Sequence, residues 1–349
     1  MNPLLTRTGA VEGSGPDEGV AWHYGDPHRE QLLLTEGLAV VDLSHRGVVT
    51  VTGPDRLTWL HSLTTQHLAG LAPRTSTEAL ILSPKGKIEH ALHVVDDGET
   101  TWLTTEPGAA EEVTRWLDSM RFMLRVEVAD VSERYAVLGE PVGTESAEGE
   151  PVAWVDPWPG PDLPGAGEGG GGAEDTFAYG PPTREHPGRG RAWRELVVPR
   201  EDLGTAVGDR PLAGTWAAEA LRVAAWRPRA GVDTDHRTIP HELDWLRTAV
   251  HLHKGCYRGQ ETVARVKNLG RPPRRVVFLH LDGSGHTLPE PGTELVPVDG
   301  GRAVGHLTSV ARHHEDGPIA LALVKRNLDP AATLLAGTTS AAQTVVVAP

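Results

Sequence analysis

The sequence has a single cysteine, Cys256, among 349 residues. One cysteine cannot form an internal disulfide, and this is typical of a reducing compartment. Residues 1–30 have no apolar signal core, and no later run is long enough to span a bilayer. We therefore expect a cytoplasmic protein with no membrane partner.

The sequence is also poor in cations relative to acids: 33 Lys and Arg stand against 47 Asp and Glu, a formal net charge of −14. Binding to nucleic acid needs a dense cationic surface, because the ligand is a chain of phosphates. We therefore expect no direct nucleic-acid partner.

Three kinds of catalytic or cofactor motif are missing. The 17 histidines include the pairs His251/His253 and His313/His314, but no closed ligand set and no second cysteine accompany them, so we expect no dedicated metal site. The glycine-rich runs at 9–15 and 169–172 lack the strand before and the helix after that a phosphate-binding loop requires. No Gly-x-Ser-x-Gly elbow is present.

The most informative segment is the octet Lys254–Glu261, which reads Lys-Gly-Cys-Tyr-Arg-Gly-Gln-Glu. Gly255 and Gly259 predict a backbone bent too sharply for a Cβ atom, which would expose Cys256 at a turn. Lys254 and Arg258 would favour the thiolate, the form that attacks electrophiles or binds metals. The alternative is that Cys256 is a small buried hydrophobic residue, as many lone cysteines are.

The octet resembles the signature of the YgfZ-type folate-binding proteins, relatives of the glycine-cleavage aminomethyltransferase that support iron–sulfur proteins. Two upstream segments, residues 229–232 (Arg-Ala-Gly-Val) and 239–242 (Ile-Pro-His-Glu), also resemble that family. Further matches lie at 42–44, 53–55 and 83–88. The resemblance therefore covers roughly residues 36 to 345.

This resemblance implies an α+β fold, with a ring-like aminomethyltransferase-type folate-binding region and a C-terminal antiparallel β-barrel. We expect an N-terminal extension over residues 1–30, the folate-binding region over 31–271 and the barrel over 272–349. Within the second part, residues 140–192 are rich in Gly and Pro and predict a flexible insert without chemistry, most mobile from Pro164 to Asp175.

The residue pattern independently predicts several elements. Residues 79–82 and 91–95 predict a hairpin, and Trp216 to Ala225 predict a helix stopped by Pro228. Five strand-like runs after Pro272 predict a small β-barrel, at 276–281, 294–298, 303–310, 319–324 and 344–347.

The resemblance also implies that tetrahydrofolate, or a one-carbon derivative of it, binds in the central hole of the ring. Cys256 would be an exposed nucleophile or a transient ligand, tuned by Lys254 and Arg258, while Glu261 orients the loop. Tyr257 would stack on a ligand ring or lie at the edge of the core. The other folate-binding candidates are Gln260, which is carried over from the signature, and Arg229 and Glu242, which would either line the hole or pair with each other.

A second candidate feature is the segment 254–275, which holds seven cations and one anion, a local charge of +6. Such a segment is either a solvated face or a site for a polyanionic ligand tail, such as the glutamyl tail of folate.

Two departures separate this chain from the aminomethyltransferase that it also resembles. That enzyme has an Ile-Asp-Asp segment where this chain reads Ile88-Glu89-His90, and Leu-Arg-Leu-Glu-Ala-Gly where this chain has Ala224 in place of the Glu. The first carboxylate serves one-carbon chemistry and the second binds the pterin. Both absences argue against aminomethyl transfer.

We therefore expect a tetrahydrofolate-binding accessory protein for the assembly or repair of iron–sulfur clusters, more a binding factor than an enzyme. Its partners would be reduced folate and iron–sulfur client or assembly proteins, with a further effect on tRNA modification through cluster enzymes. The alternatives are a folate-dependent aminomethyl or methyl transferase and a non-catalytic interaction scaffold.

Overall fold

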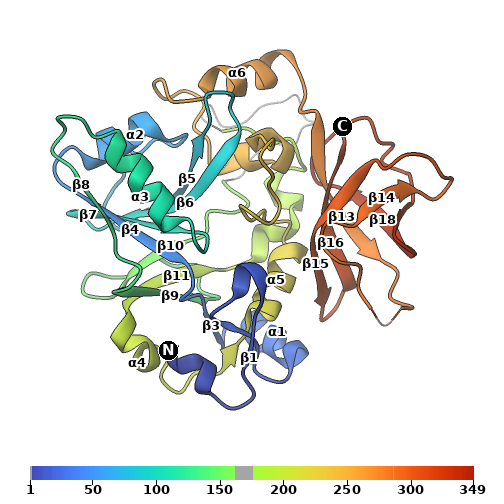
Figure 1. Cartoon of the computed structure of the whole chain (residues 1–349), viewed down its shortest axis with the longest axis horizontal. Coiled ribbons are helices and arrows are strands. Elements are labelled where there is room, and N and C mark those ends of the chain that lie inside the picture. The colour runs from blue at the N-terminus through green and yellow to red at the C-terminus, as the bar shows by residue number, and fades with distance from the viewer. Residues whose placement is uncertain (1, 162–175, 286) are drawn as a thin grey trace.

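The computed structural model describes residues 2–161, 176–285 and 287–349. In Figure 1, the part on the left holds two five-stranded sheets with their helices, and a closed barrel lies on the right. Helix α5 (Thr215–Ala224) lies between the two parts and contacts the barrel. The expected α+β fold with a C-terminal barrel is confirmed.

The first sheet is antiparallel, in the order β5 (Ser76–Leu82), β6 (Ile88–Asp96), β7 (Thr100–Thr105), β4 (Gly47–Thr52), β8 (Glu127–Asp130). Its hairpin β5–β6, in which Leu80 pairs with Ala91, was expected. Helices α2 (Arg56–Leu63) and α3 (Ala110–Ser119) cover one face. Val113 and Leu117 of α3 are one helical turn apart and are both fully buried against this sheet.

The second sheet has the order β10 (Val152–Val155), β11 (Arg194–Pro199), β9 (Tyr135–Glu140), β3 (Val40–Asp42), β12 (Leu212–Ala213). Helix α5, the expected helix at 216–225, packs against α1 (Pro27–Thr35), and α4 (Leu203–Val207) follows β11. The inward face of α5 is rich in small residues, such as Ala217 and Ala220, which lets its backbone approach its neighbours.

Residues 2–30, expected as an extension, lie against this second sheet. The Asn2 side chain donates a hydrogen bond to Asp42 at 2.6 Å, and Leu4 is buried beside Val40. Two short strands, β1 (Val11–Glu12) and β2 (Ala21–His23), pair with each other.

The described flanks of the expected insert are ordered and packed. β10 forms an edge of the second sheet, and Trp154 and Trp158 are buried. The segment Pro164–Asp175 lies outside the described residues. The Gly and Pro content of 140–192 suggested flexibility, but the buried tryptophans supply enough apolar surface to hold its two ends.

The barrel closes in the order β13 (Arg274–Leu281), β16 (Gly317–Lys325), β15 (Gly305–His313), β14 (Glu294–Pro297), β17 (Leu334–Ala336), β18 (Thr339–Val345). The sequence pattern missed β17, because three residues are too few to show an alternation. Alternate residues such as Val277, Leu279 and Leu295 fill the interior.

Helix α6 (Gln260–Leu269) connects the octet to the barrel. Short 3₁₀ helices lie at Pro3–Thr6, Gly15–Asp17, Thr183–Glu185, Pro187–Gly190, Arg200–Asp202, Pro240–Leu243 and Trp245–Arg247. Among the described residues, every helix is too short or too polar to cross a membrane.

Candidate functional site

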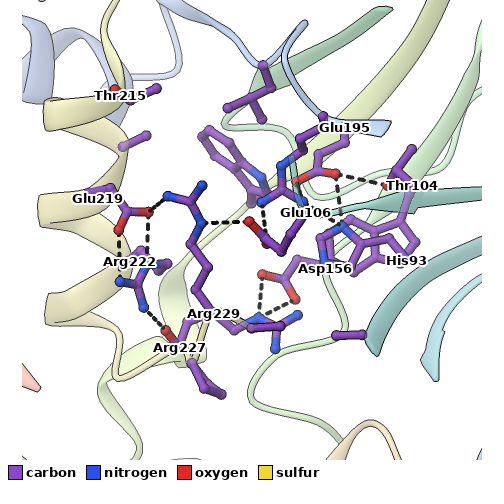
Figure 2. A pocket seen from close by; sticks show the side chains of 18 of the residues that line it. His93, Thr104, Glu106, Asp156, Glu195, Thr215, Glu219, Arg222, Arg227 and Arg229 are labelled. Atoms are coloured by element: carbon purple, nitrogen blue, oxygen red, sulfur yellow. Dashed lines mark hydrogen bonds and ion pairs between the residues drawn. The ribbon is translucent and has the colours of Figure 1, made fainter. Parts of the chain in front are cut away.

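A cavity lies where the two sheets meet α5 and the loop that follows it (Figure 2). The free volume between its side chains is about 60 Å³, which holds a few water molecules and is smaller than a typical small-molecule site. About half of the lining residues are acidic or basic: Asp17, Arg46, His93, Glu106, Asp156, Arg191, Glu195, Glu219, Arg222, Arg227 and Arg229. We call this the central cavity.

Helix α5 supplies one wall of the central cavity. Thr215, Ala218, Glu219 and Arg222 line it because residues three and four apart share a helix face. Arg222 makes a two-pronged ion pair with Glu219, with N–O distances of 2.8 and 2.9 Å. This pair fixes the orientation of both side chains.

Arg229, on the loop after α5, connects three acidic groups. It donates to Glu106 at 2.8 Å and to Asp17 at 3.0 Å, and lies 3.4 Å from Glu219. Burial alone would raise the pKa of Glu106, but the charges of Arg229 and Arg46 outweigh it and lower that pKa to about 2. Glu106 is therefore ionised throughout the physiological range.

Opposite α5, strands β6, β7 and β11 carry a second cluster. Glu195 accepts from His93 at 2.9 Å and from Thr104 at 3.3 Å, and lies 3.4 Å from Arg46. The His93 ring stacks on Trp154, with centroids 3.6 Å apart. Burial would raise the pKa of Glu195, but Arg46 and His93 hold it well below its ordinary value.

The third cluster includes residues from the expected insert, where we predicted no chemistry. Asp156 accepts from Arg191 at 2.7 Å and from Arg227 at 3.2 Å, and Arg227 reaches Glu78 at 2.7 Å. β10 pairs with β11 and brings Trp154, and Asp156 directly after it, to the cavity wall. The insert therefore contributes to the lining, and the absence of chemistry in it stays a prediction.

Some polar atoms of the lining have no partner among the described residues. They are Nε of Arg46 and one terminal nitrogen of Arg227. Buried polar atoms are rarely left unpaired, so these two groups are available to donate to a water molecule or to an acceptor group of a ligand. The described residues contain no group of three or more His, Cys, Asp or Glu placed to hold a metal ion.

The octet lies apart from the lining of the central cavity. Lys254 is buried, and its ammonium donates to the carbonyl oxygens of His61, Thr64 and Gln66 at the end of α2, the last two at 2.5 and 3.0 Å. This contact caps the carbonyl end of the helix. Burial lowers the pKa of Lys254 to about 8.

Tyr257 packs in the core beneath the octet, with the Lys254 ammonium 5.1 Å from its ring centre. Of its two expected roles, the structure shows the core contact. Gln260 and Glu261 begin α6, where Glu261 is exposed in the first turn. A carboxylate there complements the positive end of the helix dipole.

Of the two glycines in the octet, Gly259 lies at a position where only glycine fits. Its φ is +85°, and a Cβ atom would lie 2.7 Å from the Ser83 carbonyl oxygen and 2.9 Å from the Cα of Gly86. Gly86 itself has a φ of +72°. Gly255, which we also expected at a sharp bend, has no left-handed φ and open space around it. The octet therefore docks on the β5–β6 turn through two glycines.

Cys256 is exposed, so the alternative of a buried thiol is excluded. Arg258 donates to Glu89 at 2.9 Å, at the start of β6. Ala91 and His93 line the central cavity, but Glu89 is the extra residue of a bulge in β6, so it does not follow the alternation of these two residues. The roles proposed for Cys256, Lys254 and Arg258 stay predictions.

The remaining predicted site residues lie in different parts of the structure. Arg229 lines the central cavity, whereas Glu242 pairs with Arg274 at 2.8 Å, so Arg229 and Glu242 do not pair with each other. The cationic segment 254–275 does not form one surface: Arg274 is paired with Asp235 as well, and Arg275 is fully buried against backbone carbonyls.

Comparisons with known proteins identify the fold of this chain. Residues 18–140 match the model of the GCVT N-terminal domain. A solved structure, aminomethyltransferase T of the glycine cleavage system from Bartonella henselae, superposes with a TM-score of 0.74, covering 99% of this chain and 95% of that one at 18% identity. The chain therefore has the aminomethyltransferase-type fold.

Two curated relatives illustrate the sequence similarity. A chloroplastic protein of Arabidopsis thaliana, named only as a candidate transferase, is 25% identical over 325 residues, which cover 85% of this chain and 67% of that protein. The aminomethyltransferase of Moorella thermoacetica is 27% identical over 323 residues, 86% of this chain and 82% of that enzyme.

Proposed function

We propose that the central cavity binds a reduced folate, and that the protein is a cytoplasmic, tetrahydrofolate-dependent accessory factor for assembling or repairing iron–sulfur clusters. The observation that carries the folate proposal is the cavity lining, in which carboxylates and guanidinium groups are paired with one another. The YgfZ-like octet and the exposed Cys256 support the iron–sulfur part.

The polar groups of the lining match the donors and acceptors of a pterin, and the ion-paired side chains would move apart to admit the ring. A pterin ring presents adjacent N–H donors and a carbonyl acceptor. Glu219 and Glu106 would accept from the N–H groups, and the unpartnered nitrogens of Arg46 and Arg227 would donate to the carbonyl. When bound, tetrahydrofolate supplies a carrier for one-carbon groups.

The central cavity contains carboxylates even though position 224 is an alanine. Ala224 is not among the lining residues of the central cavity, while Glu219, on the opposite side of the same helix, is. We therefore assign pterin recognition on α5 to Glu219. We assign no role in binding a glutamyl tail to the cations of 254–275, because Lys254, Arg258, Arg274 and Arg275 have partners within the protein.

The segment Ile88-Glu89-His90 supports an accessory role over transfer. Glu89 is ion-paired with Arg258, and the His90 ring lies 3.9 Å from Glu112 of α3. Neither residue lines the central cavity. Proton transfer to a folate nitrogen needs an acid held within hydrogen-bonding reach. We propose that Cys256 instead acts as an exposed nucleophile or transient ligand toward client proteins.

Calorimetric titration with tetrahydrofolate tests the binding. At about 100 times its dissociation constant, the ligand should add roughly 2.7 kcal/mol to the free energy of unfolding. The variant Glu219→Gln should bind more weakly, while Glu111→Gln, an exposed glutamate on α3, should bind like the wild type. A folded protein with no thermal shift at millimolar tetrahydrofolate would contradict the proposal, and would leave the interaction scaffold as the alternative.

Aminomethyl transfer is the second candidate, favoured by the relatives named aminomethyltransferase. A coupled assay with an aminomethylated lipoyl carrier protein and tetrahydrofolate, run beside a genuine aminomethyltransferase, separates the two. We expect a rate lower by about 10²- to 10⁴-fold, the usual contribution of a positioned acid or base. Turnover within about tenfold of the control would establish the transferase, and Glu89→Gln would then be the informative variant.

A further inference from the structure

The barrel reaches the central cavity through a bulge in β15. The pairing of β15 with β16 shifts register between Leu307 and Ser309, which makes Thr308 an extra residue. Neighbouring side chains of a regular strand point to opposite faces, but a bulge can re-aim one of them. Here the hydroxyls of Thr308 and Ser309 both donate to the same carboxylate oxygen of Asp233, at 2.5 and 2.7 Å.

The other oxygen of Asp233 holds the cavity lining. It accepts from the guanidinium of Arg222 at 2.8 Å and from the backbone N–H of Arg229 at 3.0 Å. Arg222 also donates to the Ser309 hydroxyl at 2.7 Å. Asp233 is completely buried, so each of these bonds is shielded from water.

These contacts join the barrel to the residues that would face a ligand. Arg222 fixes Glu219, and Arg229 fixes Glu106. A groove between residues 12–22 and the barrel meets the central cavity at Asp17, Glu219 and Arg229, and Thr308 and Ser309 form part of its wall. Two further polar contacts of the barrel, those of Arg274 with Asp235 and Glu242 and that of Gln31 with Arg312, include no residue of the cavity lining.

We propose that Asp233 is a positioning residue and that the bulge of β15, through Thr308 and Ser309, makes the barrel a determinant of ligand affinity in the central cavity. The proposal rests on the proposed function for the identity of the ligand, tetrahydrofolate. Removing both hydroxyls leaves one buried oxygen of Asp233 unsatisfied, which favours a shift of the carboxylate and of the two arginines that it holds.

The first test uses the unliganded protein. In Thr308→Val/Ser309→Ala, phenylglyoxal should modify Arg222 and Arg229 at least about fivefold faster than in the wild type, since a lost hydrogen bond to a charged group shifts local equilibria by about this much or more. Peptide mass spectrometry gives the rate at each arginine. Arg247, buried in an ion pair with Asp244, is the internal control and should stay protected.

Thr293→Val is the matched control variant, because its hydroxyl bonds only within an exposed barrel turn. If the double variant does not fold, Ser309→Ala alone, which removes one of the two hydroxyls, takes its place. Unchanged reactivity of both Arg222 and Arg229 in a folded variant would overturn the proposal.

The second test uses tetrahydrofolate. Its dissociation constant should rise about tenfold in the double variant, the equivalent of one charged hydrogen bond, and should not change in Thr293→Val. By reciprocity of coupling, tetrahydrofolate should slow amide exchange in residues 305–313 of the wild type and not of the double variant.

The two tests distinguish a failure of the proposed function from a failure of the proposed role of the barrel. A wild-type protein that does not bind tetrahydrofolate refutes the proposed function, while the arginine rates still decide whether Asp233 positions the lining. A wild-type protein that binds, with an equal dissociation constant in the double variant, overturns the role of the barrel.

Discussion

The central cavity and the octet loop both contain buried cations, but they neutralise them with different partners. In the cavity, Arg229 and Arg46 face the carboxylates of Glu106 and Glu195, which belong to side chains. In the loop, Lys254 faces three backbone carbonyls at the end of α2. Side-chain partners can rearrange when a ligand enters, whereas helix carbonyls cannot. The cavity is therefore suited to binding, and Lys254 to holding a loop in place.

The central cavity and the octet loop also differ in how many of their charged groups depend on one another. Asp17, Glu106 and Glu195 are ion-paired with residues of elements far apart in the chain, so a change there disturbs contacts between several elements. The octet presents one exposed thiol on a firmly attached loop. Four substitutions measure how far this contrast extends.

The largest expected effect is in the cavity. Glu106→Gln removes the charge that Arg229 and Arg46 face, and should lower the free energy of unfolding at pH 7 by about 3 kcal/mol, from the shift of the pKa from 4.5 to about 2. Because the folded-state pKa is lowered, this contribution is complete above pH 4.5 and is lost as the pH falls toward 2. Urea unfolding across this range should show a steeper acid limb in the wild type than in the variant.

The control for this substitution is Glu111→Gln. Glu111 pairs with Arg115 on the exposed face of α3, four residues away, and such pairs contribute less than about 0.5 kcal/mol. Equal losses in the two variants would show that the cavity network is no stronger than a surface pair.

The second effect concerns the docking of the octet. Gly259→Ala places a Cβ against Ser83 and Gly86 at a φ of +85°, and should cost roughly 2–4 kcal/mol from backbone strain and overpacking together. Gly255→Ala, four residues earlier in open space, should change stability by less than about 0.5 kcal/mol. Denaturant midpoints for the pair give the comparison, and a similar cost at both positions would refute the contact with the β5–β6 turn.

A third, smaller effect should follow from Lys254→Met. Three carbonyls would lose a donor, at a cost of about 1–3 kcal/mol for buried groups left unsatisfied. The exposed Arg265 on α6 provides the control Arg265→Met, which should be nearly neutral. Amide exchange at residues 61–66 should rise in the first variant alone, and unchanged exchange there would argue that Lys254 does not cap α2.

The smallest effect on stability is expected for Cys256→Ala, within about 0.5 kcal/mol of the wild type, because the side chain is exposed. The native protein should nevertheless react with iodoacetamide, and the variant should fail to restore iron–sulfur enzyme activity in cells that lack the protein. Labelling that needs denaturant, or full rescue by the variant, would remove Cys256 from the proposed mechanism.

The elements that the sequence predicted are those with a repeating pattern. The β5–β6 hairpin, α5 and five of the barrel strands show alternation or helical spacing, which depends on local backbone geometry alone. β17 is too short for such a pattern, and β10 was hidden in a segment whose Gly and Pro content suggested disorder.

Most residues of the central cavity could not be predicted from the sequence. Its ion pairs join Asp17 to Arg229 and His93 to Glu195, and only the packing of separate sheets and loops brings these residues together. Arg229 was identified through a family resemblance and not through any local signal. The octet showed the opposite limitation: Lys254 and Arg258 flank Cys256 in the chain, yet the structure directs them to α2 and to Glu89.

The contact between Gly86 and Gly259 has an evolutionary consequence. Because a Cβ on either residue meets atoms of the opposing segment, neither glycine can be replaced without a change on the other side. The β5–β6 turn and the octet should therefore be inherited together, and a search pattern that joins both glycines should identify relatives of this chain more selectively than the octet alone.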